Sequence, residues 1–292
     1  MRKVKKMGIM DKDMFGVCKY EQSIQFLKYY CEGKKVLCAF SGGKDSQCCY
    51  HLLKDAGIPF TAQYSITRFE PPELISFIRE NYPDVEFRRA YRTSLIKEIE
   101  YGGLPNRWYR WCCNAKHAKV KGYDISIIGV RAEESARRKE TWRVFGQKRD
   151  RTYYCCPIFS WTDDDVWEYL NEIKKVKHCC LYDEGFKRIG CICCPLARHN
   201  DEDIKRFPKM VNVLRIGNRM FWNRIVSVGG KTIRGKPYKI LGHKNADAAF
   251  EHWLKYMTTD PDTIEVKEEQ GCLFEGTGFS EKDGQTEMEE LE

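Results

Sequence analysis

A six-residue stretch, Ser41-Gly42-Gly43-Lys44-Asp45-Ser46, constrains the fold of this chain more than any other part of it. An apolar run over residues 36–40 precedes it, and residues 47–56 carry apolar side chains at helical spacing, which predicts a strand, a glycine turn and a helix start. The two glycines allow backbone N–H groups to turn into one concavity, the helix start adds partial positive charge, and Lys44 adds a full charge. The stretch therefore predicts a loop that holds a phosphate chain, with an ordinary glycine turn as the alternative.

This loop is not a Walker A motif, which needs glycine at the position of Cys38 and Ser or Thr directly after the lysine. The string instead resembles the pyrophosphatase loop of the adenine nucleotide alpha-hydrolase (PP-loop) superfamily. That superfamily includes phosphosulfate reductases, the small subunit of sulfate adenylyltransferase, and several tRNA and DNA sulfurtransferases. The resemblance implies that the loop residues bind an adenine nucleotide: Ser41, Gly42, Gly43, Lys44, Asp45 and Ser46.

Length and cysteine usage set outer limits. At 292 residues the chain can bury a full core in one large or two small domains. Its 15 cysteines occur mainly as adjacent pairs in a lysine-rich sequence, which favours thiols and metal ligands over a disulfide scaffold. The basic N-terminus meets Asp11 before an apolar stretch forms, so we expect no signal peptide, no membrane span and a cytoplasmic location.

Charge is distributed unevenly along the chain. The net charge is +8, but residues 270–292 hold seven acidic side chains and one lysine, so the tail carries −6 and the rest of the chain +14. A body this basic favours an anionic partner. A phosphate-lined cleft, a nucleic acid and scattered solvated lysines remain alternative explanations.

The hydrophobic patterns predict an α/β fold with a doubly wound, mostly parallel sheet and a small helical C-terminal region. Residues 14–31 predict an amphipathic helix, and residues 60–66 and 85–87 predict strands that follow the loop helix. Thr67 stands at the carboxyl end of the first of these strands, where open α/β sheets bind ligands, and the resemblance implies that it helps to hold the adenine. The predicted domains are an N-terminal helical segment (1–33), a PP-loop nucleotide-binding domain with a cysteine cluster (34–198), a helical cap (199–262) and an acidic, disordered tail (263–292).

Arginines follow the strongly apolar strand predicted at residues 124–130. They would present planar guanidinium groups, which suit phosphate and sulfate oxygens, at the carboxyl edge of the sheet. The segment resembles a second signature of the same family, Gly-x-Arg-x-x-Glu-Ser-x-x-Arg, and an ordinary charged helix is the alternative. The resemblance implies four site residues: Arg131, Glu134, Ser135 and Arg138. A later stretch, residues 157–170, is also similar to the family; we interpret it as packing, with Thr162 as a helix N-cap.

Two cysteine groups supply the ligand count of a metal centre. An adjacent pair and a Cys-x2-Cys motif give four thiolates, as a [4Fe–4S] cluster or a structural zinc requires. The arrangement resembles the adenosine-phosphosulfate reductase branch, with a Cys-Cys pair, a lysine nearby and a later Gly-Cys-x-x-Cys, which implies Cys112, Cys113, Cys191 and Cys194 as ligands. Zinc and plain buried thiols remain alternatives, Cys193 is a further candidate, and the pairs at 155–156 and 179–180 are interpreted as thiols.

Four blocks between residues 34 and 195 thus resemble the phosphoadenosine phosphosulfate (PAPS) reductase family, closest to its iron–sulfur adenosine-phosphosulfate (APS) reductase branch. The resemblance implies an oxidoreductase with Lys44, Arg131 and Arg138 as catalytic residues and a nucleophilic tail cysteine, for which Cys272 is the candidate although the Glu-Cys-Gly-x-His motif is missing. An ATP-dependent sulfurtransferase that modifies tRNA or DNA and a non-catalytic nucleotide or cluster sensor are the alternatives. The implied partners are an adenine nucleotide (PAPS, APS or ATP), a thioredoxin-like or other electron donor, and a second copy of the chain in a homo-oligomer.

Overall fold

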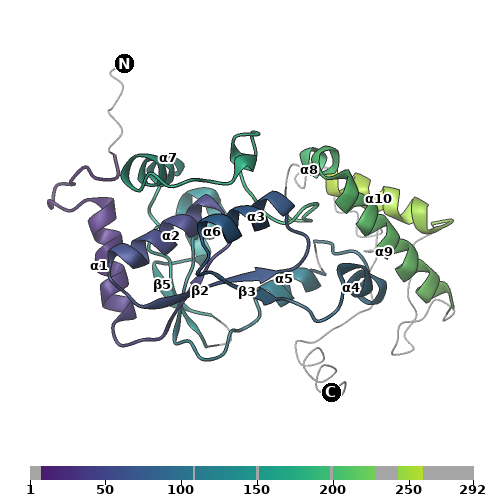
Figure 1. Ribbon diagram of the computed structural model, residues 1–292, viewed down its shortest axis with the longest axis horizontal. Helices are drawn as coiled ribbons and strands as arrows, with labels where there is room; N and C mark the ends of the chain where they lie inside the picture. Colours follow the sequence, from purple (N-terminus) through teal and green to yellow (C-terminus); the bar gives the residue numbers. More distant parts are fainter. Residues whose placement is uncertain (1–7, 108, 149–150, 198–199, 228–242, 259–292) are drawn as a thin grey trace. The chain divides into compact units, whose positions relative to one another are not determined.

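The computed structural model describes residues 8–107, 109–148, 151–197, 200–227 and 243–258 (Figure 1). The chain divides into two compact units, Met1–Ala90 with Asn114–Cys191 and Tyr91–Cys113 with Ile192–Glu292. No sequence signal indicates that residues 91–113 group with the later part of the chain. The domain boundaries predicted from the sequence stay predictions, and the predicted tail with Cys272 lies outside the described residues.

The first unit is built on a six-stranded sheet with the strand order β3-β2-β1-β4-β6-β5. All neighbouring strands run parallel except β5, which is antiparallel to β6 at one edge. The predicted mostly parallel, doubly wound α/β fold is therefore confirmed. The strands are β1 (Val36–Ala39), β2 (Phe60–Ile66), β3 (Glu86–Arg89), β4 (Ile125–Ile127), β5 (Phe145–Gln147) and β6 (Tyr153–Cys155).

The strand order contains a switch point that matters for function. From β1 the chain proceeds outward through β2 to β3, and then returns to place β4 on the other side of β1. The carboxyl ends of β1 and β4 are therefore neighbours, with Val36 paired to both Phe60 and Ile125. In open α/β sheets a ligand binds outside the carboxyl ends of the strands at such a point.

Helices of the first unit cover this sheet. Helix α1 starts at Lys19, five residues later than the predicted start, because the Asp13 carboxylate accepts hydrogen bonds from the backbone of Phe15 and Val17 and holds a turn there. The side chain of Cys18 then caps the helix in a capping box with Glu21. The helices are α1 (Lys19–Cys31), α2 (Lys44–Asp55), α3 (Pro72–Asn81), α6 (Ala136–Thr141) and α7 (Asp163–Glu168), with shorter turns η1 (Ala132–Glu134), η2 (Tyr169–Ile173) and η3 (Cys180–Tyr182).

Aliphatic side chains from the strands and from α2 and α3 form the core of the first unit. Leu52, Leu53, Ile78, Ile125 and Ile127 are fully buried. Burial of this extent favours the folded state by about 25 cal/mol for each Å² of apolar surface removed from water. The helix that follows the glycine loop is thus fixed to the sheet by its own apolar face, and the loop is held at a defined place.

The second unit is helical. Helix α9 packs closely on α4. The approach requires glycine at position 217, because a Cβ atom there would lie only 2.9 Å from Ile99. The indole of Trp253 donates a hydrogen bond of 2.9 Å to the carbonyl of Pro105, which fixes α10 to the segment after α4. Its helices are α4 (Leu95–Gly102), α8 (Asn200–Arg206), α9 (Pro208–Ser227) and α10 (Ala246–Thr258), and α5 (Trp111–Lys116) crosses the boundary between the units. None of the helices in the described ranges has both the length and the apolar composition that crossing a membrane requires.

Candidate functional site

The glycine loop connects β1 to α2 and is held by bonds of its own. Gly42 has a φ of +73°, and a Cβ atom there would lie 2.7 Å from Leu74 and from Ile78, so only glycine fits. The hydroxyl of Ser46 donates to the carbonyl of Gly43 at 2.8 Å and accepts from the backbone N–H of Ser41 at 3.1 Å. The loop is thereby closed onto the first turn of α2.

The segment after β4 lies directly against this loop. A Cβ atom on Gly129 would come within 2.8 Å of the backbone carbon of Asp45, so glycine is needed for the close approach. Arg131 follows two residues later and donates from Nε to Asp45 Oδ1 at 2.5 Å. The two segments that resemble the family thus meet at the switch point of the sheet, as their positions after β1 and β4 require.

Two buried cations, Lys44 and Arg131, share one carboxylate. Their side chains are only 5% and 4% exposed. The Asp163 oxygen Oδ1 lies 3.2 Å from Lys44 Nζ and 2.7 Å from Arg131 Nη2, and the Asp163 side chain is 51% exposed. Burial alone would lower the pKa of Arg131, but Asp45 and Asp163 raise that pKa above its usual value, so the guanidinium stays charged.

Asp163 is a residue that the sequence analysis did not assign to the site. The predicted N-cap at Thr162 is confirmed, since its hydroxyl accepts from the backbone of Asp165. The predicted packing role holds for part of residues 157–170, because Trp161 is 1% exposed and Val166 is fully buried. The same helix start nevertheless carries Asp163 to the two cations. The run of three aspartates was the only signal, and it does not show which carboxylate reaches the loop.

A tyrosine hydroxyl occupies one backbone donor of the loop. The N–H of Lys44 donates to the Tyr182 hydroxyl at 3.0 Å, and Lys44 Nζ lies 5.8 Å from the centre of the Tyr182 ring. Trp167 contacts the same ring edge-on at 5.1 Å. Burial raises the pKa of Tyr182, so the phenol is neutral at physiological pH. Tyr182 therefore stands where a phosphate oxygen would accept a hydrogen bond from the loop.

The remaining residues of the second signature bond mainly to one another. The Ser135 hydroxyl caps α6 by accepting from the backbone of Arg138 at 3.2 Å, and the Arg138 guanidinium forms an ion pair with Glu134. Burial raises the pKa of Glu134. The structure therefore brings Arg131 to the loop. The bonds of Glu134, Ser135 and Arg138 instead stabilise the start of helix α6.

Thr67 lies at the end of β2, in a second polar cluster of the first unit. It is fully buried, and both its backbone N–H and its hydroxyl donate to Glu70, the hydroxyl at 2.6 Å. Glu70 lies 3.7 Å from Lys116 Nζ. The Cys191 sulfur is 3.9 Å from both Lys116 Nζ and Thr67 Oγ1. This places one predicted metal ligand beside the ammonium group of a lysine.

The four predicted cysteine ligands belong to different units. Cys191 is in the first unit, whereas Cys112, Cys113 and Cys194 are in the second. Within the residues that the structure describes, no group of three or more His, Cys, Asp or Glu side chains is arranged to hold a metal ion. The ligand set therefore stays a prediction. Of the cysteine pairs interpreted as thiols, Cys155, Cys156 and Cys179 are buried, and burial raises the pKa of Cys179 to about 11.

Comparison with known proteins identifies the family of the chain. A family model described as the phosphoadenosine phosphosulfate reductase domain matches residues 35–197, just over half of the chain. Over 201 residues the chain is 33% identical to an uncharacterized protein of Methanocaldococcus jannaschii (62% of this chain, 42% of that protein). Over 133 residues it is 31% identical to an adenosine 5′-phosphosulfate reductase of Oceanobacillus iheyensis (43% of this chain, 55% of that protein). The chain thus spans about half the length of the first curated relatives that it matches.

Among solved structures, the phosphate complex of a phosphoadenylyl-sulfate reductase from Candida auris superimposes with a TM-score of 0.44 and 15% sequence identity. The superposition covers 58% of this chain and 88% of that one.

Proposed function

The chain belongs to the phosphoadenosine phosphosulfate reductase domain family, and on that premise we propose that it binds an adenine nucleotide carrying a phosphosulfate group and reduces or transfers the sulfur of that group. The observation that carries the proposal is the pair of buried cations, Lys44 and Arg131, at the adjoining ends of β1 and β4. Buried cations need anionic partners, and here the shared partner is a half-exposed carboxylate that an incoming phosphate can replace.

Each group of the site has a role in this proposal. The N–H groups of the glycine loop and Lys44 bind the phosphate oxygens, and the planar fork of Arg131 binds phosphate or sulfate oxygens. When the nucleotide enters, Asp163 gives up its place between the cations and Tyr182 releases the N–H of Lys44. The cations then stabilise the charge that develops on the nucleotide phosphate as it leaves.

In the reductive reaction a cysteine thiolate attacks the sulfur of the phosphosulfate. The S–O bond to the α-phosphate breaks, AMP (from APS) or adenosine 3′,5′-bisphosphate (from PAPS) leaves with the electron pair, and the cysteine becomes an S-sulfonate. A dithiol protein of the thioredoxin kind then attacks the cysteine sulfur and releases sulfite, and its second thiol resolves the mixed disulfide. We propose Cys272 as the nucleophile.

We keep a [4Fe–4S] cluster on Cys112, Cys113, Cys191 and Cys194 as a prediction, with zinc as the alternative metal. Support comes from the spacing of the cysteines and from the cation beside Cys191. Because the described residues do not assemble this ligand set, no step of the proposed reaction passes through the cluster.

Calorimetric titration with APS, PAPS and ATP tests the binding site. Lys44→Ala should weaken the preferred nucleotide by about 1.5–3 kcal/mol, roughly a ten- to 150-fold change, because a charge-assisted bond is lost. Lys54→Ala is the matched control, since Lys54 is an exposed lysine at the other end of the same helix. Equal affinities of the two folded variants would remove the loop from the site.

Intact-mass analysis tests the reaction. After incubation with APS or PAPS we expect one added sulfonate that is absent from Cys272→Ser and present in a control, Cys180→Ser, whose thiol is exposed. Absence of the adduct, together with conversion of ATP to AMP and pyrophosphate in the presence of tRNA or DNA, would replace the reductase with an adenylating sulfurtransferase. Nucleotide binding without either reaction would indicate a sensor.

A further inference from the structure

Four aromatic rings form a continuous ladder across α1, β5 and β6 in the first unit. Tyr29 meets Tyr30 edge-on at 5.0 Å. Tyr30 stacks on Phe145 at 4.4 Å with an interplanar angle of 4°, and Phe145 stacks on Tyr153 at 5.5 Å with an angle of 13°. Two of the rings come from α1 and two from the consecutive strands β5 and β6, which are far from α1 in the sequence, and the fold places all four in one row.

The inner and outer rings of this ladder differ in exposure. Tyr30 and Phe145 are half-buried, and their stacking holds α1 against the edge strand β5. The outer rings are open to solvent, since Tyr29 is 77% and Tyr153 is 42% exposed. Packing explains the inner pair but not the exposure of the two tyrosines at the ends. Tyr153 continues the stack and Tyr29 stands edge-on at its other end, and exposed aromatic rings of this kind are platforms on which further flat rings can stack.

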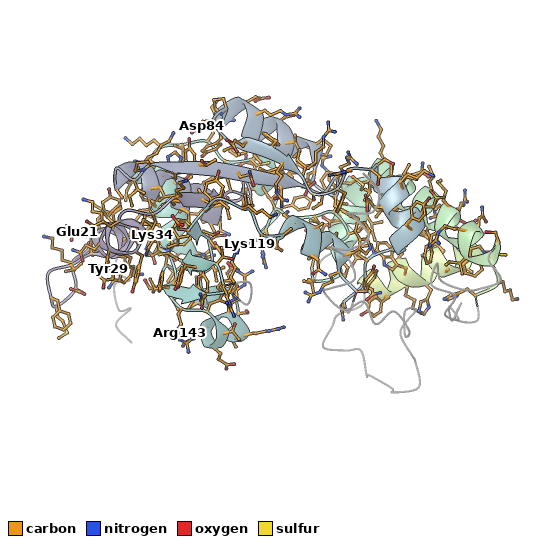
Figure 2. All side chains as sticks on the ribbon, turned by 90° about the horizontal axis from the view of Figure 1, so that it is seen from below. Glu21, Tyr29, Lys34, Asp84, Lys119 and Arg143 are labelled. Carbon is orange, nitrogen blue, oxygen red and sulfur yellow. The ribbon has the colours of Figure 1, made fainter. Side chains whose placement is uncertain are left out.

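Positive charge accompanies the ladder. Lys34 Nζ lies 5.7 Å from the centre of the Phe145 ring and donates to the carbonyl of Tyr30 at 2.7 Å. The described residues of the segment around β5, 137–148 and 151, hold six Lys or Arg and one acidic side chain. Arg143 donates from Nη1 to three backbone carbonyls at the end of α6. Figure 2 looks onto this side of the first unit and labels Tyr29, Lys34 and Arg143 on it.

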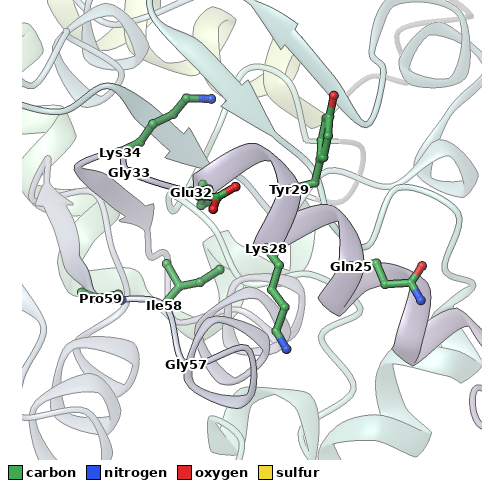
Figure 3. A pocket seen from close by; sticks show the side chains of 10 residues that line it. Gln25, Lys28, Tyr29, Glu32, Gly33, Lys34, Gly57, Ile58 and Pro59 are labelled. Atoms are coloured by element: carbon green, nitrogen blue, oxygen red, sulfur yellow. The ribbon is translucent and has the colours of Figure 1, made fainter.

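A surface hollow of about 690 Å³ continues from one end of the ladder (Figure 3). Tyr29 and Lys34 line it and belong to the ladder as well, and Lys28 lies on its other side. The lining also includes the Glu32 carboxylate and the Gln25 amide, groups that can hydrogen-bond the edges of nucleic-acid bases. The hollow therefore adds one further cation, Lys28, and polar partners to the aromatic row.

Tyr153 and the hollow lie at the amino-terminal ends of the parallel strands, opposite the phosphate loop, whereas Phe145 of the antiparallel β5 pairs with Cys155 at the carboxyl end of β6. Tyr153 is the first residue of β6 and is in register with Ile125, the first residue of β4, which pairs with Val36 at the start of β1. The loops before β1 and β2 line the hollow at the same edge. The phosphate loop instead follows the carboxyl end of β1. Whatever binds to the ladder is thus distinct from the nucleotide at the loop.

We propose that this face, defined by Tyr29, Tyr30, Lys34, Phe145 and Tyr153 with the adjoining hollow, binds a single-stranded nucleic acid. Exposed rings with lysine side chains beside them match unpaired bases on a phosphate backbone, because bases stack on the rings while cations neutralise phosphates. An acidic protein is a poorer match for this face, because it would pair with the cations but would leave the row of aromatic rings unused. The proposal does not depend on which reaction occurs at the glycine loop.

Fluorescence anisotropy without adenine nucleotide tests the proposal. The probes are labelled oligonucleotides of about twelve nucleotides and mixed sequence, in RNA and DNA forms, and the corresponding duplexes. We expect single strands to bind more tightly than duplexes. Tyr29→Ala and Tyr153→Ala should each weaken binding about five- to 150-fold, the loss measured when one base–aromatic stack is removed. Lys34→Gln should weaken binding and reduce the slope of log affinity against log salt by about 0.7.

Two substitutions in the second unit are matched controls: Tyr101→Ala, which removes a tyrosine that is 57% exposed, and Lys97→Gln, which removes an exposed lysine charge. Both should leave binding unchanged, and thermal melting should show that all variants are folded. Equal affinity of the tyrosine variants and the wild type, or equal affinity for single strands and duplexes, would overturn the proposal. Absence of oligonucleotide binding, with self-association that Tyr29→Ala abolishes, would overturn it as well and assign the face to a second copy of the chain.

Discussion

Neutralising Asp163 should have opposite effects on stability and on nucleotide affinity. Its carboxylate lies 3.2 Å from Lys44 Nζ and 2.7 Å from Arg131 Nη2. At the dielectric constant of water, charges at these separations attract by about 1.3 and about 1.5 kcal/mol. Because the Asp163 side chain is half exposed while both cations are buried, the water value is a lower bound for this attraction, and repulsion from Asp45 and Glu133, which also contact Arg131, offsets part of it.

We therefore expect Asp163→Asn to lower the free energy of unfolding by about 1–2 kcal/mol. The same variant should bind ATP or APS about fivefold to thirtyfold more tightly, because the phosphate no longer competes with a carboxylate for the two cations. Urea denaturation measures the first quantity and isothermal calorimetry the second. Asp164→Asn is the matched control, because it removes the same charge from the next residue of the same helix turn.

The result that would refute this reasoning is a folded Asp163→Asn protein whose nucleotide affinity is reduced. Asp163 would then contribute to nucleotide binding, and its carboxylate would stay between the two cations when the nucleotide is bound. Equal changes in Asp163→Asn and Asp164→Asn would refute it in a different way, since the effect would then come from the general charge of the helix start rather than from the bridge.

Three further predictions concern other parts of the chain. Tyr182→Phe should raise ATP affinity about two- to tenfold in a calorimetric titration, because the N–H of Lys44 is no longer bonded to the hydroxyl; weaker or unchanged binding would contradict this. Burial lowers the pKa of His51 to about 4, so between about pH 7 and about pH 5 the unfolded chain takes up a proton that the folded chain does not. Wild type should therefore lose about 1–2 kcal/mol more stability over this range than His51→Gln in urea denaturation, and parallel pH profiles would exclude the linkage. Protein purified without oxygen should be brown, with broad absorbance at about 400 nm that Cys191→Ser abolishes. Colourless wild-type protein with stoichiometric zinc would contradict the predicted [4Fe–4S] cluster.

The sequence predicted the parts of this protein that depend on neighbouring residues. Strand, glycine loop and helix start are encoded within residues 36–56, because the apolar spacing, Gly42 and Lys44 are local features. The parallel order of the sheet followed from strands that alternate with helical segments. The proximity of the loop to Arg131 could also be expected, since both follow strands whose carboxyl ends meet at one edge.

Contacts between distant segments were decided by the tertiary structure alone. Tyr182 reaches the N–H of Lys44 across 138 positions of sequence, and Asp163 reaches both cations from the start of a helix that the sequence presents as packing. Neither residue has a local pattern that marks it, because which of several exposed polar side chains meets the loop depends on the path of the chain after β6. The sequence therefore determined the kind of site and its cations, whereas only the folded chain selected the carboxylate and the hydroxyl that accompany them.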